Sequence, residues 1–244
     1  MDACEVPPFV EAKVAEVRAA RVAAGGGEEE LGPVQFTMAP FPGSPGKCVA
    51  LVFWTDLRAP SQTKIFVATY PAPRGFPIAE GLLEWDRLLS GASGPVVDPV
   101  PFPVSPSAGA FAIRTHARLL DVRVQGVESR FDLVVDVGSN SLRSVLTRTT
   151  AEVGPRIVGN NLSVDPDSTQ GFEKTEDLYI LRDSTNGGFR DILVRHYVTR
   201  GEAIAANRRL VKQVSYRWDG VQYVEAPSPP APLPGGEGRK ETPR

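Results

Sequence analysis

The 244-residue chain has only two cysteines and two histidines, and no long hydrophobic segment. The longest apolar run near its middle, residues 48–54, is far shorter than the roughly 20 residues that a membrane-spanning helix needs. The two cysteines do not form a Cys-x-x-Cys motif, so neither a thioredoxin-like redox site nor a structural zinc site is expected. With two histidines, a histidine-based zinc centre is not expected either.

The chain also lacks an excess of charge of either sign. Its 27 lysines and arginines oppose 29 aspartates and glutamates, for a net charge of −2. Such a balance gives no general attraction to nucleic acid or to an anionic membrane, so nucleic acid is not an expected partner. The 23 prolines and 23 glycines favour turns and extended segments over long helices.

Motifs for nucleotide binding and nucleophilic catalysis are missing. Residues 43–48 partly match the end of a phosphate-binding loop, but Phe41 stands where its first glycine belongs and Cys48 where its hydroxyl belongs. No Gly-x-Ser-x-Gly occurs, and no serine is an evident partner for His116 or His196, which both fall in predicted strands. A hydrolase would therefore depend on carboxylates, of which a group lies close together in sequence: Glu173, Glu176, Asp177, Asp183 and Asp191.

The N-terminal sequence leaves the location of the protein open. Residues 1–4 have neither the basic region nor the apolar core of an export signal, which favours the cytoplasm. If a signal has been removed, the protein is extracytoplasmic (periplasmic, surface-exposed or secreted), and Ala3-Cys4 suits the start of a lipid-anchored protein. Cys4 and Cys48 are either one disulfide, joining the N-terminal arm to a strand, or two buried thiols.

The first half of the chain is predicted to be one helix followed by strands. Valines at 10, 14, 17 and 22 follow helical spacing over residues 7–24, and Gly25 to Gly27 are suited to ending that helix. Residues 78–89 carry leucines and a tryptophan that suggest a short amphipathic helix. Strands are expected at 34–38, 48–54 and 64–70, and the proline-rich residues 91–108 as an extended segment.

The second half is predicted to be sheet throughout. The clearest hairpin lies at 216–223, where Asp219-Gly220 supplies a tight turn between strands that carry aromatic residues. Residues 226–244 are rich in proline, glycine and charge, so a disordered tail is expected there. The other expected strands are residues 111–124, 131–137, 142–149, 177–182, 190–199, 209–218 and 222–225.

A glycine-rich acidic loop at residues 183–191 runs directly into the apolar residues 192–194. This segment of about a dozen residues resembles the FG-GAP or VCBS repeats of secreted bacterial β-proteins, whose acidic loop often holds calcium. The resemblance implies that Asp183, Thr185 and Asp191 are the candidate calcium ligands. Thr185 and Gly187 stand where the family has oxygen-rich side chains, so a calcium site here would lack ligands, and a turn in which both acids bind loop amides is the alternative.

These observations predict a mainly β protein, an antiparallel sandwich or partial propeller-like sheet assembly with one N-terminal helix. Four regions are expected: 1–27 with the helix, 28–108 and 109–225 as two β-rich halves, and 226–244 as the tail. The function that fits best is a non-enzymatic, extracytoplasmic structural or binding module with a protein or carbohydrate partner and no cofactor other than calcium. A carboxylate-based hydrolase and a cytoplasmic β-scaffold are the alternatives.

Overall fold

The computed structural model describes residues 4–26, 32–56, 58–59, 61–89, 94–120, 124–155, 157–158, 163–164, 172–200 and 208–227. The protein is mainly β, with one helix and two large antiparallel sheets, as the sequence predicts. Among these residues, no helix combines the length and apolarity needed to cross a bilayer. The expected tail at 226–244 lies outside the described residues from 228 on.

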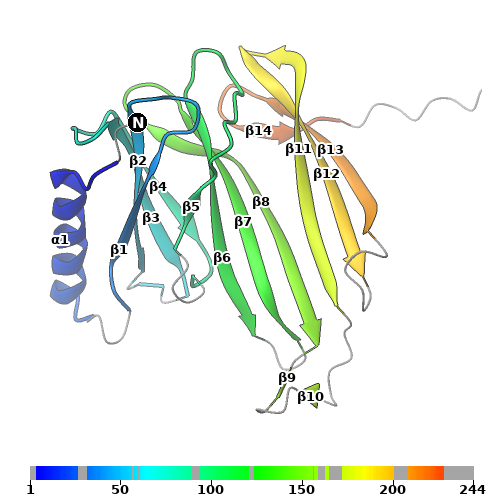
Figure 1. The fold of residues 1–244 in the computed structure, drawn as a ribbon, viewed down its shortest axis with the longest axis horizontal. Coiled ribbons are helices and arrows are strands. Elements are labelled where there is room, and N and C mark those ends of the chain that lie inside the picture. Colours follow the sequence, from blue (N-terminus) through cyan, green and yellow to red (C-terminus); the bar gives the residue numbers. More distant parts are fainter. Residues whose placement is uncertain are drawn as a thin grey trace, which may run out of the picture.

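The helix and the first sheet form the N-terminal side of the molecule (Figure 1). Sheet A has the strand order β1-β2-β3-β4, which follows the chain. The elements are α1 (Pro8–Ala23), β1 (Gln35–Pro40), β2 (Lys47–Thr55), β3 (Thr63–Pro71) and β4 (Ala79–Trp85).

Sheet B has eight strands in the order β14-β13-β12-β11-β8-β7-β6-β5. Its strands are β5 (Val96–Val97), β6 (Ala110–Leu120), β7 (Val124–Asp136), β8 (Leu142–Pro155), β11 (Glu173–Asn186), β12 (Phe189–Arg200), β13 (Arg208–Trp218) and β14 (Tyr223–Glu225). A separate small ladder joins β9 (Ile157–Val158) to β10 (Ser163–Val164).

Sheet A is covered on both faces. On one face, α1 packs its valines, among them Val10 and Val14, against Ala50 and Phe66. On the other face, Leu51 and its neighbours pack against residues of sheet B such as Phe111. The apolar run at 48–54 is continuous because β2 is buried on both sides.

The helix predicted at residues 78–89 is wrong, because these residues contain strand β4 instead. Alternate side chains at Ala79, Leu83 and Trp85 are buried, while Glu80 points outward, so the burial follows the two-residue period of a strand. The sequence places Leu82 and Leu83 together on the apolar face of a helix, but in the structure only Leu83 is in the core and Leu82 is 52% exposed.

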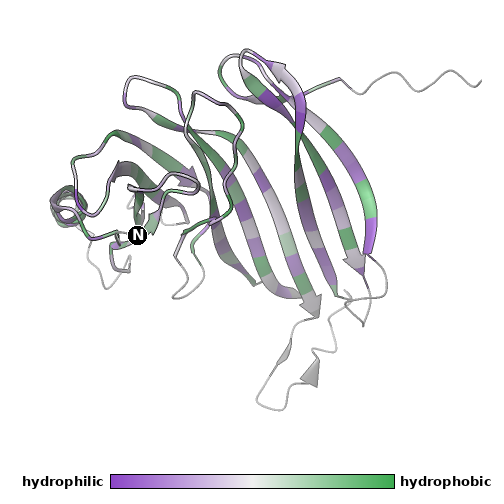
Figure 2. Ribbon diagram, turned by 45° about the horizontal axis from the view of Figure 1, so that its top comes forward, coloured by the Kyte–Doolittle hydropathy of each residue, from purple (hydrophilic) through white to green (hydrophobic). Residues whose placement is uncertain are grey.

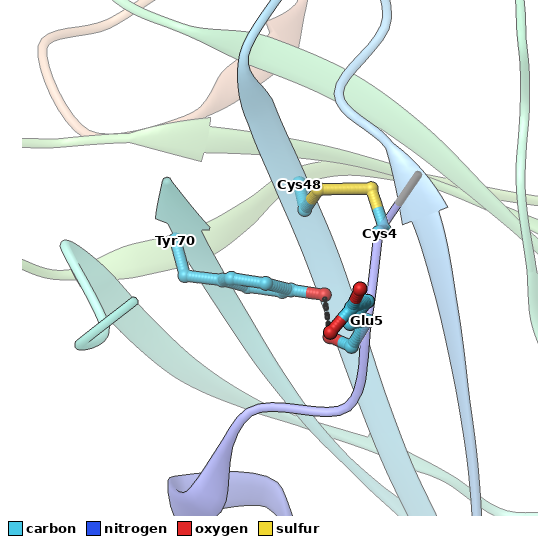
Figure 3. Close-up of a disulfide and its surroundings, with 4 residues drawn as sticks. All are labelled: Cys4, Glu5, Cys48 and Tyr70. Atoms are coloured by element: carbon cyan, nitrogen blue, oxygen red, sulfur yellow. Dashed lines mark hydrogen bonds between the residues drawn. A yellow bond between two sulfur atoms is a disulfide. The ribbon is translucent and has the colours of Figure 1, made fainter. Parts of the chain in front are cut away.

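The two cysteines form a disulfide that ties the N-terminal arm to β2 (Figure 3). The Cα atoms of Cys4 and Cys48 are 5.9 Å apart, and beside them the Tyr70 hydroxyl donates to the backbone oxygen of Glu5 at 2.9 Å. The alternative of two free thiols is therefore wrong. Cys4 also has no free sulfur for a lipid, so the interpretation of Ala3-Cys4 as a lipid-anchored start does not fit this structure.

Sheet B curls strongly around its inner face, the face turned away from sheet A. Arg148 on β8 donates a hydrogen bond to the Tyr216 hydroxyl on β13, at 3.1 Å. On a flat sheet these two strands, three positions apart, would be separated by about 14 Å. Side chains stand roughly perpendicular to a sheet, so this contact requires the two halves of sheet B to bend toward each other.

The junction between the two halves of sheet B is narrow. Among the described residues, the ladder between strands β8 and β11 pairs only Glu173 with Val153 and Lys174 with Glu152, and the Thr175 hydroxyl adds hydrogen bonds to the Ala151 backbone. This pairing lies at the end of the sheet where β6 and β8 end and β7 and β11 begin, called the lower end from here on (Figure 1). The inner face is therefore enclosed by β6, β7 and β8 on one side and by β11, β12 and β13 on the other.

The two hairpins of the second half differ in their turns. Gly220 has a φ of 105° between β13 and β14, but Asp219 has no positive φ and Trp218 pairs with Tyr223, so this turn spans four residues and is not the tight Asp-Gly turn that the sequence predicts. Gly187 and Gly188, with φ of 56° and 80°, form the two-residue turn between β11 and β12. The strands of sheet B carry alternating hydrophilic and hydrophobic bands (Figure 2).

Candidate ligand-binding groove

The upper part of the inner face of sheet B, toward β14, is filled by an apolar cluster. Phe131 on β7 and Tyr179 on β11 stack with ring centroids 4.1 Å apart, and Phe102 packs against both rings. The segment that carries Phe102 is held to the second half of the sheet, since Arg190 N–H donates to the Val104 oxygen at 2.7 Å. This part of the curled sheet is solid core.

Below the apolar cluster lies a buried polar cluster centred on Asp177. The Asp177 side chain is 1% exposed, and its contacts connect the two halves of sheet B. Arg148 Nε on β8 donates to Asp177 Oδ2 at 2.9 Å, and His196 Nδ1 on β12 lies 2.7 Å from Oδ1. Both carboxylate oxygens are thus occupied, and the buried charge of Asp177 has the paired, hydrogen-bonded environment that burial demands.

The surroundings of this cluster shift the pKa values of Arg148 and Tyr179. Burial lowers the pKa of Arg148, but the hydrogen bond and negative charge of Asp177 outweigh that effect and leave it raised. Burial, followed by the charge of Asp177, raises the pKa of Tyr179 well above its usual range. The guanidinium of Arg148 therefore stays charged and the phenol of Tyr179 stays neutral at physiological pH.

Next to the Asp177 cluster, a second polar pair spans β6 and β7. His116 faces Ser129 across the ladder, and its Nδ1 lies 2.8 Å from the Ser129 hydroxyl oxygen. A small hollow of about 30 Å³ lies between this pair and the cluster and is lined by Ser129, Arg148 and Asp177 among others. A hollow of this size has room for about one water molecule and is too small for a larger ligand.

Beyond the polar pair, the lower end of the inner face opens into a groove of about 830 Å³. This volume lies within the range of small-molecule sites, about 300–1,000 Å³. Residues of β6, β7 and β8 line it together with Phe172, which immediately precedes β11. The lining includes His116, Arg118, Val127, Ser129, Glu152 and Phe172.

One cross-strand row sets the chemistry of the groove. Arg118 pairs with Val127, Val127 with Glu152, and Glu152 with Lys174, so charged groups lie on either side of an apolar centre. Glu152 and Lys174 are 3.8 Å apart. Arg118 is exposed and makes no ion pair or hydrogen bond with any residue that the structure describes.

Two glycines shape the groove in opposite ways. A Cβ on Gly126 would lie 2.1 Å from the Glu152 backbone oxygen, so β7 and β8 can approach this closely only with glycine there. A Cβ on Gly154 would meet only the Phe172 ring, at 4.0 Å, and therefore has open space before it. Gly154 is the position at which a larger side chain would fill the groove without disturbing the strands.

The residues singled out as calcium ligands lie elsewhere, on the β11–β12 hairpin. Asp183 is fully exposed and accepts a hydrogen bond from Arg190 Nη2 at 3.0 Å. Thr185 is in β11 and pairs with Arg190 in the ladder, so the loop of the repeat-like motif is a hairpin arm here. Asp191 is buried, accepts from the Ser184 hydroxyl at 2.8 Å and lies 3.5 Å from Arg217.

The two acids of this hairpin thus have separate partners. In the part of the chain that the structure describes, no three His, Cys, Asp or Glu side chains gather in a way that could hold a metal ion. The FG-GAP resemblance and calcium binding at Asp183, Thr185 and Asp191 both stay predictions.

The five carboxylates considered for catalysis are also dispersed. Glu173 pairs with Arg200 at 2.5 Å and Glu176 with Arg208 at 3.4 Å, both through exposed arginines. Of the five, Asp177 is in the buried cluster on the inner face. The sequence grouped them because they follow one another along β11 and β12, where alternate residues point to opposite faces.

Sequence reasoning did not find the groove or the Asp177 cluster. The one available signal was the alternation of Arg114, His116 and Arg118, which places three basic side chains on one face of β6. Arg148 and Asp177 are 29 residues apart, and their contact follows from the curl of sheet B and the narrow junction of its halves.

No protein-family model, no curated protein and no solved structure matches the chain.

Proposed function

We propose that the protein is a non-enzymatic, extracytoplasmic binding module that holds a small ligand in the groove at the lower end of sheet B. The observation that carries this proposal is the open hollow of about 830 Å³ at the lower end of the inner face, below the apolar cluster. A concave site with an apolar centre and a few polar side chains at its border is the usual form of a small-molecule site.

The extracytoplasmic location is supported by the Cys4–Cys48 disulfide. Disulfides persist in oxidising compartments and are rare in the cytosol, where thiols are kept reduced. The test is to trap free thiols by alkylation in intact cells and measure the mass of the protein under non-reducing conditions. Alkylation of both cysteines in the native host would contradict the proposed location.

Binding without catalysis is supported by the state of Asp177. Both of its oxygens are engaged, by Arg148 and His196, so it is not a free general acid or base. The deep hollow beside it has room for about one water molecule, so a substrate would have to react in the outer groove.

A hydrolase is the second candidate, and one observation favours it. A carboxylate that accepts from a histidine ring, as Asp177 does at His196 Nδ1, is the arrangement that orients a general base. Hydrolysis of 4-nitrophenyl esters that disappears in His196→Gln, while the variant keeps its melting temperature, would support the hydrolase. Equal rates in both proteins would count against it.

The proposed groove can be tested with N-phenyl-1-naphthylamine, an uncharged dye that fluoresces in apolar sites. We expect saturable binding of one dye per chain and its loss in Gly154→Leu, whose side chain would occupy the groove. Val221→Leu, an exposed position in the turn before β14, is the matched control and should bind as the native protein does. Saturable binding that Gly154→Leu leaves unchanged, or no saturable binding, would overturn the proposal.

A further inference from the structure

We propose that the ligand of this groove is an elongated amphiphile with an anionic end, and that Arg118 binds the anion. This inference rests on the proposed binding function and specifies its ligand class. It combines three features of the groove: an arginine that has no partner among the described residues at one side, an apolar centre, and an acidic side chain at the other side.

Arg118 differs from Arg114 and Arg148, which lie on the same face of sheet B. Arg114, two residues earlier on β6, donates to Asp98 Oδ2 at 2.8 Å, and Arg148 is paired with Asp177. Arg118 has no such partner among the described residues, although it lines the groove. The fork of donors on a guanidinium matches carboxylate, phosphate and sulfate groups, so an anionic group is the partner that fits it.

His116 adds a second polar group on the same side of the groove. It lies two residues before Arg118, on the same face of β6. Its Nδ1 is engaged by Ser129, which leaves Nε2 as the ring nitrogen that can reach a ligand. The anion-binding side of the groove is therefore built on β6 by Arg118 with His116.

The opposite side of the groove disfavours an anion. Glu152 lies two strands from Arg118, about 9.6 Å away at the usual strand spacing. Lys174 forms an ion pair with its carboxylate at 3.8 Å but lies closer to Glu176, at 3.3 Å, so the single positive charge of Lys174 is shared between two carboxylates. This asymmetry orients a ligand with its charged end toward β6.

The space between the two charged sides is apolar. Val127, between Arg118 and Glu152 in the row, is 39% exposed, and Phe172 covers the open space before Gly154. An apolar chain that extends from the anion would lie along these side chains. It would not penetrate further inward, because the hollow beside Asp177 has only about 30 Å³.

The test is displacement of bound N-phenyl-1-naphthylamine from the full chain by decanoate and by 1-decanol, which share a chain length and differ in charge. We expect decanoate to displace the dye at concentrations at least about tenfold lower, because a charge-assisted hydrogen bond is worth a factor of this size. Arg118→Gln should remove the preference, and Arg118→Lys should restore part of it. Arg209→Gln, an exposed arginine on β13, is the matched control and should keep the full preference.

The outcomes separate this inference from the proposed function. If the dye does not bind, the groove proposal fails first. If the dye binds in the groove but decanoate and decanol compete equally, or if Arg118→Gln keeps the preference, only the amphiphile proposal is overturned. Displacement by acetate at the same concentrations as decanoate would also overturn it, since that result would assign the site to small anions.

Discussion

Sheet A and the lower end of sheet B are built from similar strands but differ in what covers them. In β2, six successive residues are buried, because α1 covers one face and sheet B the other. In β13, the first six residues are exposed, and β14 pairs only with its last three. The comparison suggests that one region supplies most of the stability while the other keeps an open surface for a ligand.

Burial supports this division. The two clusters that involve sheet A are apolar and continuous from α1 through β2 to β6. The lower end of sheet B instead places an arginine, a glutamate and a histidine on its inner face. Apolar burial is the main favourable term in folding, so substitutions should be more costly in the first region and more visible in ligand binding in the second.

The largest difference in the free energy of unfolding should be between alanine variants of two phenylalanines. Phe111 is fully buried between the sheets and packs on Phe41, with ring centroids 5.2 Å apart, so Phe111→Ala should cost about 3–5 kcal/mol. Phe172 is only partly buried, and Phe172→Ala should cost roughly 1 kcal/mol or less while weakening dye binding. Urea unfolding measures both, and equal costs would remove the distinction between the regions.

The Asp177 cluster should be an exception within sheet B. Asp177→Ala leaves the partly buried charge of Arg148 without its partner, so a loss of about 3–5 kcal/mol is expected. The control is Asp183→Ala, which removes an ion pair whose carboxylate is fully exposed and should leave the free energy of unfolding almost unchanged. Chemical unfolding of both variants gives the comparison, and similar losses would show that the cluster does not hold the halves together.

Loss of the disulfide should lower the free energy of unfolding somewhat less than Phe111→Ala does. It closes a loop with a sequence separation of 44 residues, so the double variant Cys4→Ser with Cys48→Ser should lose about 2–4 kcal/mol. The midpoint of urea unfolding, compared with that of the native protein with and without reductant, checks this. A loss that reductant does not reproduce in the native protein would point to the serine side chains instead.

The smallest expected effect is a pH dependence at the β13–β14 turn. Backbone N–H groups of Gln222 and Val221 donate to Asp219 and lower its pKa in the folded protein. Its stabilisation is therefore complete above the unfolded pKa of about 3.9 and is lost as the pH falls through the folded pKa. The melting temperature of Asp219→Asn should approach that of the native protein below pH 4, and a constant difference from pH 7 to pH 2 would refute this.

Local signals in the sequence predicted much of the fold. The valine spacing identified α1, and Asp219-Gly220 identified the final hairpin, because both depend on neighbours in sequence. The helix predicted at residues 78–89 was wrong because the positions of Leu82 and Leu83 fit both the helical and the strand period. The close approach of Gly81 to β8 is compatible with the strand. A Cβ on Gly81 would lie 2.2 Å from the Leu142 oxygen, a contact that no local pattern reveals.

The site was less predictable than the fold for a physical reason. Arg118 stands out only because Arg114 and Arg148 have partners, and those partners, Asp98 after β5 and Asp177 on β11, come from other parts of the sheet. The acidic hairpin at 183–191 drew attention as a motif, yet its acids are engaged by Arg190 and Ser184. Strand pairing and sheet curl determine which charges are compensated.

The most direct test of the account is amide hydrogen exchange of the full chain with and without N-phenyl-1-naphthylamine. The groove predicts slower exchange on binding in residues 114–120, 124–131 and 148–155, and unchanged exchange in α1 and in residues 47–71 of sheet A. Slower exchange confined to α1 or sheet A, with the lower end of sheet B unchanged, would contradict the central claim that the open end of the curled sheet is the ligand site.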